Sequence, residues 1–145
     1  MKKFLVLLLA LVIVFSFAAC GGKTGGKTEA YKVAMITDYG DITDQSFNQT
    51  TYEACKAFCT DNKVEFTYFK PAGDNTADRV AMIEKAVDEG YNVIVMPGYA
   101  FAPAIAATAP EYEDVLFIAL DVSEYDLTSA GLETLPANLY SAVYQ

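Results

Sequence analysis

The chain has 145 residues, 53% of them hydrophobic and 20% charged, which is enough for one domain with a buried core. Its formal net charge of −9 argues against nucleic acid as a partner, because phosphates require a basic protein face. The sequence contains no histidine, which excludes imidazole metal sites and histidine-dependent catalytic triads from this chain.

The N-terminal segment has the pattern of an export signal. Lys2 and Lys3 precede a largely apolar run over residues 4–19, which is shorter than the roughly 20 residues of a spanning helix. The run ends in Ala18-Ala19-Cys20, which resembles a bacterial lipobox, where small residues precede a cysteine that becomes lipidated. We therefore predict a signal peptide over residues 1–19, lipidation of Cys20 and attachment to the extracytoplasmic face of the cell membrane. The alternative is an ordinary signal peptide followed by an incidental cysteine.

Residues 21–28, GGKTGGKT, match the phosphate-loop pattern G-x-x-x-x-G-K-[ST]. A phosphate loop follows a strand and opens a helix, whereas this segment precedes the first predicted strand. Its glycine-rich composition favours a flexible tether over residues 20–30, with the globular part at residues 31–145.

Apolar runs alternate with helical patterns in the globular part. Strands are predicted at residues 31–37, 64–69, 93–96 and 115–120, with a fifth at 138–144. Helices are predicted to follow the first three strands. This alternation predicts an α/β fold in which a parallel sheet lies between two helical layers.

The first helix begins near Asp44 or Ser46. Ser46 and Gln49 fit the S-x-x-Q capping box, and Asp44 is a second candidate cap. The next helix is predicted to be capped by residue 74, 75 or 76 and to bury a stripe at residues 80, 83 and 87.

Two cysteines lie four residues apart on the first helix. Tyr52, Cys55, Phe58 and Cys59 share one helical stripe, which predicts that they are buried. Cys55 and Cys59 are either a metal or redox pair or two small core residues. The sequence offers no further ligands beside them, which favours the core.

Polar and small residues follow three strands. Asp38, Gly98 and Asp121 come directly after the first, third and fourth strands, so a parallel sheet gathers them at its carboxyl edge. Carboxylates there can accept hydrogen bonds from a small ligand, and Gly98 lets the backbone approach it. Phe47 can stack on a planar base or a sugar face. The alternatives are that the aspartates are helix caps or loop acids and that Phe47 fills the core.

No catalytic or cofactor motif accompanies these residues. The sequence lacks the G-x-S-x-G elbow and the G-x-G-x-x-G fingerprint, and no acid pair has a spacing suited to general acid–base chemistry. Asp38, Asp41 and Asp44 do not follow the EF-hand pattern. We expect neither an enzyme nor a bound metal or cofactor.

The segment ITDYGDITDQSFNQTTYEA resembles the Bmp/PnrA-like basic membrane lipoproteins, and VDEGYNVIVMPGY and FIALD are consistent with that family over residues 31–145. The resemblance implies a substrate-binding protein of an ABC importer with a type I periplasmic-binding fold, which binds purine nucleosides between two lobes. It implies ligand contacts from Asp38, Phe47 and Asn48, with Phe47 stacked on the base and Asp121 near the ribose. Gly98 and Tyr99 lie in the matching strand-end loop.

Family members have more than one lobe, so the resemblance implies an N-terminal lobe without its second lobe, and a permease as partner. Three alternatives stay open: a ligand-sensing receptor on the same fold, a binding protein for a sugar or other small polar solute, and an enzyme of flavodoxin-like architecture.

Overall fold

The structure of the protein is a computed structural model that describes residues 30–143. The predicted signal peptide, the lipidation site Cys20 and nearly all of the tether lie outside this range, as does the end of the last predicted strand. Within the described residues, no helix has the length and apolar character needed to cross a membrane.

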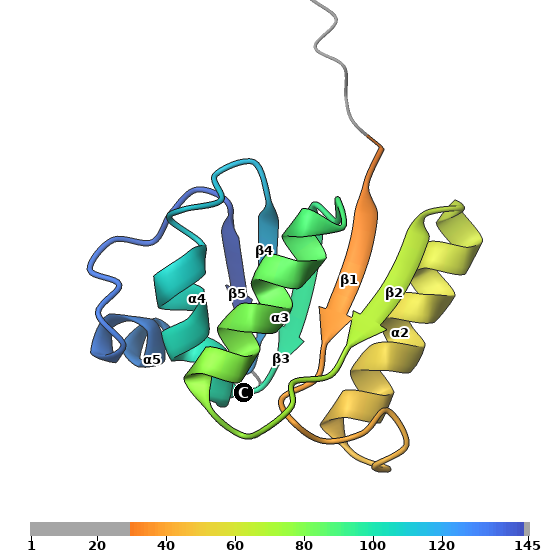
Figure 1. Cartoon of the computed structure of the whole chain (residues 1–145), viewed down its shortest axis with the longest axis horizontal. Coiled ribbons are helices and arrows are strands. Elements are labelled where there is room, and N and C mark those ends of the chain that lie inside the picture. Colours follow the sequence, from red (N-terminus) through yellow and green to blue (C-terminus); the bar gives the residue numbers. More distant parts are fainter. Residues whose placement is uncertain (1–29, 144–145) are drawn as a thin grey trace, which may run out of the picture.

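Five parallel strands form the centre of the molecule (Figure 1). They are β1 (Lys32–Ile36), β2 (Glu65–Phe69), β3 (Val93–Pro97), β4 (Leu116–Leu120) and β5 (Leu139–Ala142). The order across the sheet is β2-β1-β3-β4-β5, and every neighbouring pair is parallel. All five carboxyl ends therefore meet at one edge, where the arrowheads lie in Figure 1.

Helices cover both faces of the sheet, which confirms the predicted three-layer α/β fold (Figure 1). They are α2 (Phe47–Asn62), α3 (Thr76–Asp88), α4 (Ala102–Thr108) and α5 (Glu124–Ser129), with a 3₁₀ turn, η1 (Tyr99–Phe101), before α4. Helix α2 lies on one face, and α3, α4 and α5 lie on the other.

The alternation of side chains explains why the central strands β1, β3 and β4 are almost entirely apolar. In β1, Ala34 and Ile36 pack toward α3 and α4, whereas Val33 and Met35 pack toward α2. Successive side chains of a strand point to opposite faces, so a strand covered on both sides needs apolar residues at every position.

The cysteines belong to the core between α2 and the sheet. Cys59 is buried, and Tyr52 and Cys55 pack beside it. Burial, with a smaller effect from Cys59, raises the pKa of the Cys55 thiol to about 11, which suppresses the reactive thiolate. The prediction for Phe58 was wrong: its side chain is 61% exposed.

Two features of the helix ends differ from the expectation. Ser46 makes no side-chain cap; instead Asp44 Oδ1 accepts hydrogen bonds from the amides of Ser46 and Gln49, at 2.8 and 3.2 Å. The side chain of Gln49 accepts from the Gln45 amide rather than from that of Ser46.

Helix α5 was not predicted, since its six residues are too few to show a helical period.

We expect Phe117→Ala to lower the free energy of unfolding by about 3–5 kcal/mol, because the ring is fully buried in β4 and its removal leaves a cavity. Phe58→Ala is the matched control and should change it by less than about 0.5 kcal/mol. Urea denaturation measures both. Equal losses would contradict this assignment of core and surface.

Candidate functional site

Asp38, Gly98 and Asp121 fall in one row across three neighbouring strands. Met35 of β1 pairs with Val95 of β3, and Val95 pairs with Ile118 of β4. Continuing this register by three residues aligns residues 38, 98 and 121 just beyond the strand ends. Neighbouring strands are ~4.8 Å apart, so β1 and β4, the strands that the two aspartates follow, are about 10 Å apart. The strand order thus brings these predicted site residues to one edge of the sheet.

The backbone at the ends of β3 and β4 is tied together and locally unusual. The Gly98 amide donates to the carbonyl of Leu120 at 2.7 Å. Gly98 has a φ of 108°, and a Cβ added to it would meet nothing within 4 Å. Its backbone conformation, rather than lack of space, therefore requires glycine. Asp121 has a φ of 58°, a left-handed conformation that is uncommon outside glycine and is often found at functional sites.

The carboxylate of Asp38 has one oxygen committed to the loop that follows β1. Its Oδ1 accepts from the amides of Tyr39 and Gly40 at 2.6 and 2.7 Å and from Asn48 Nδ2 at 2.8 Å. Within the described residues no hydrogen bond to Oδ2 is present, so this oxygen can accept from a ligand hydroxyl or amine.

The charge of Asp38 is stabilised where it lies. Burial by itself raises the pKa of this carboxyl, but the hydrogen bonds from Gly40, Tyr39 and Asn48, together with the positive charge of Arg79, outweigh burial. The pKa of Asp38 therefore lies below its ordinary value, and the group is an anion at neutral pH.

Asn48 connects the loop to the first turn of α2. Its Nδ2 donates to Asp38 Oδ1 and to Asp44 Oδ2, at 2.8 and 2.9 Å, and its Oδ1 accepts from the Asp38 amide at 3.2 Å. Only 4% of Asn48 is exposed. Gly40 packs so closely that a Cβ there would lie 2.6 Å from Asn48 Nδ2. Asn48 thus supports the Asp38 carboxylate through hydrogen bonds. A direct contact between the Asn48 amide and a ligand stays a prediction.

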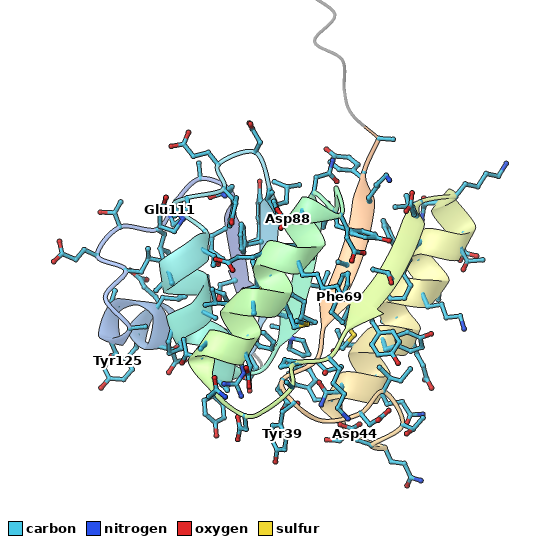
Figure 2. The ribbon with its side chains drawn as sticks, in the orientation of Figure 1. Tyr39, Asp44, Phe69, Asp88, Glu111 and Tyr125 are labelled. Carbon is cyan, nitrogen blue, oxygen red and sulfur yellow. The ribbon has the colours of Figure 1, made fainter. Side chains whose placement is uncertain are left out.

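Exposed aromatic side chains surround this edge. Phe47, the first residue of α2, is 42% exposed and so does not simply fill the core. Tyr99 is 70% exposed and lines a shallow cavity of about 240 Å³ between η1, α4 and α5, together with Asp126 and Ala130. Tyr39, which was not predicted as a site residue, is exposed on the loop after β1. Figure 2 shows it at the same edge of the molecule as Asp44.

Arg79 was not predicted from the sequence as a site residue. Its side chain is almost fully buried in the first turn of α3. A usable signal was present, since Arg79 falls on the stripe that includes Ile83 and Ala86. A charged residue on a buried stripe indicates a specific partner nearby.

The arrangement can bind and orient a small ligand. Two carboxylates provide hydrogen-bond acceptors, and exposed aromatic rings provide flat surfaces for stacking. Among residues 30–143, no group of three or more acidic or cysteine side chains converges in a way that could hold a metal ion.

Comparison with known proteins agrees with this architecture. The family model described as "ABC transporter substrate-binding protein PnrA-like" matches residues 31–145. A solved ABC transporter solute-binding protein from Aeropyrum pernix superposes with a TM-score of 0.64 at 20% identity. That superposition covers 77% of this chain and 28% of the other, and it shows the fold.

Two curated relatives are similar in sequence. An uncharacterized lipoprotein of Pyrococcus furiosus is 30% identical over 113 residues, which are 77% of this chain and 28% of the relative. The ABC transporter nucleoside-binding protein BmpA of Lactococcus lactis is 26% identical over 122 residues, which are 78% of this chain and 34% of the relative. The chain spans about a third of the length of these relatives.

We expect Asn48→Ala to destabilise the protein by about 1–3 kcal/mol, because it leaves partly buried polar groups of Asp38 without their partner. Thr50→Ala removes an exposed hydrogen bond on the same helix and should change stability by less than about 0.5 kcal/mol. Thermal and urea denaturation provide the measurement. An Asn48→Ala protein as stable as the Thr50→Ala protein would show that the loop does not depend on this amide.

The lowered pKa of Asp38 predicts a pH-dependent contribution to stability. An unfolded aspartate titrates near pH ~3.9, so the stabilisation from the Asp38 charge is complete above that pH and is lost as pH falls through the lower folded pKa. Asp38→Asn cannot titrate. The difference in free energy of unfolding between wild type and Asp38→Asn should be constant from about pH 5 to 7 and shrink below about pH 4. A difference that stays constant down to about pH 2.5 would contradict the lowered pKa.

Proposed function

The chain belongs to the PnrA-like family of ABC transporter substrate-binding proteins, and we propose that it forms part of a protein that captures a purine nucleoside. The ligand is passed unchanged to an ABC permease. The printed name of the Lactococcus lactis relative supports a nucleoside as the ligand.

The observation that carries this proposal is the row formed by residues 38, 98 and 121 at the carboxyl edge of the sheet. The two aspartates follow β1 and β4, which flank β3 at a separation of about 10 Å, comparable with the length of a nucleoside. Asp38 Oδ2 and the carboxylate of Asp121 are hydrogen-bond acceptors, suited to ribose hydroxyls and base amino groups. An acidic edge also disfavours phosphorylated ligands, because like charges repel.

Phe47 supplies the stacking surface in this proposal. Its ring is partly exposed on the first residue of α2, next in sequence to Asn48, which is hydrogen-bonded to Asp38. A base placed against the ring buries apolar surface that is now in contact with water. Tyr99 borders the site from the turn after β3, and its role as a ligand contact is part of the proposal.

The binding protein acts on the outside of the cell in this proposal. Residues 1–19 direct export, and a lipid on Cys20 holds the protein at the membrane. The lipoprotein name of the Pyrococcus furiosus relative supports this anchor. Capture follows the hinge closure of two-lobed binding proteins, in which this α/β unit supplies one wall and no catalysis takes place.

We expect inosine, guanosine or adenosine to produce saturable shifts in the ¹⁵N–¹H NMR signals of Asp38, Phe47 and Gly98. NMR titration detects millimolar affinities, so it suits a site with a single wall. Phe47→Ala should weaken binding by about 1–3 kcal/mol, the cost of losing one base–aromatic stack. Phe58→Ala removes an exposed ring from the far part of the same helix and should leave the affinity unchanged.

Two outcomes would overturn parts of this proposal. Saturable shifts with ribose or an amino acid, and none with the three nucleosides, would remove the nucleoside assignment. Equal affinities for wild type and Phe47→Ala would remove Phe47 from the stacking role.

A further inference from the structure

Arg79 is a buried cation next to the proposed site. Its side chain is 5% exposed, and its Nε has no hydrogen-bond partner within the described residues. It lies in the first turn of α3, which begins at Thr76 after the loop that follows β2.

The guanidinium of Arg79 contacts two segments at the carboxyl edge of the sheet. Its Nη2 forms an ion pair with Asp74 in the loop after β2. On another side, the guanidinium carbon lies 5.7 Å from the ring centroid of Phe101, which belongs to the turn after β3 and is fully buried. Its charge also contributes, as the last and smallest of the causes, to the lowered pKa of Asp38 in the loop after β1.

Stability alone does not account for this residue. Burial of a charge costs free energy, and replacement of a buried ionic group by an apolar residue of similar volume is often neutral or stabilising. Ile83 and Ala86 make the same stripe apolar farther along α3, so an apolar side chain at position 79 would fit the pattern. The contacts of Arg79, in contrast, all lead to loops at the carboxyl edge.

We propose that Arg79 is a positioning residue for the ligand site, which holds the loop after β2 against the turn after β3. Arg79 does not touch the ligand. Its effect on binding passes through the turn that begins at Gly98. This inference rests on the proposed function.

The first test separates positioning from stability. We expect Arg79→Met to weaken inosine binding by on the order of tenfold, within the range of coupling between residues of one network, while the midpoint of urea unfolding stays the same or rises. Lys85→Met is the matched control: it removes a cation from the same helix, where the ammonium lies 5.3 Å from the centroid of Phe69. Its affinity for inosine should equal that of wild type. Arg79→Met with unchanged affinity, or with losses of affinity and stability that Arg79→Lys does not restore, would overturn the inference.

A double-mutant cycle shows the route of the effect. In an Asp74→Asn background, Arg79→Met should cost much less affinity, because the ion pair through which Arg79 holds the loop after β2 is already lost. In an Asp121→Asn background the effect should persist, since Asp121 follows β4 and is not among the contacts of Arg79. Full additivity with Asp74→Asn would contradict this route.

A measurement without ligand separates this inference from the proposed function. If wild type binds no nucleoside, the proposed function fails, and Arg79 is then judged by amide hydrogen exchange in the full chain. The Phe101 amide donates to the Gly98 carbonyl. We expect it to exchange faster in Arg79→Met than in Lys85→Met. Equal rates in the two variants would overturn the positioning role.

Discussion

The side-chain amide of Asn48 sets the shape of the loop on which the candidate site depends. A primary amide has two donor hydrogens and one acceptor oxygen, and here these groups connect the end of β1 with the start of α2. Because Asn48 is buried, these hydrogen bonds are partly shielded from water and costly to break. They fix one oxygen of Asp38, leave the other without a partner among residues 30–143, and place Phe47 at the first position of the helix. The tight contact of Gly40 with this amide leaves little room for another loop conformation.

Parallel pairing extends this local constraint to the whole edge. The parallel strands all end at the same edge of the sheet. Residues 38, 98 and 121, which follow three of these strand ends, therefore lie in a row although 83 positions separate the first from the last. The hydrogen bond from Gly98 to Leu120 and the buried contacts of Arg79 join the loops between strands. The edge is acidic and carries exposed aromatic rings, a combination suited to uncharged, hydroxyl-bearing ligands.

Much of the fold could be predicted from the sequence because its signals were local. Apolar runs bounded by glycine, proline and aspartate identified the strands to within about two residues, and alternation with helices identified the parallel sheet. The row of residues 38, 98 and 121 followed from that topology.

Side-chain contacts that depend on packing could not be predicted in the same way. Ser46 fitted a capping box, but Asp44 was close enough to take the same amides. Phe58 fitted the helical stripe but lies just outside the contact with the sheet, and Arg79 was missed because its burial depends on Asp74 and Phe101, which belong to other segments.

The most direct test of this account is the exchange of the two Asn48 side-chain amide protons with water, followed by NMR in the protein without ligand. If Nδ2 donates to Asp38 and Asp44 inside the loop, both protons should give resolved signals and exchange far more slowly than those of an exposed side-chain amide such as that of Gln45. Exchange of the Asn48 protons as fast as that of the Gln45 protons would contradict it. The loop would then lack its central connection, and the orientation of Asp38 and Phe47 would have no structural basis.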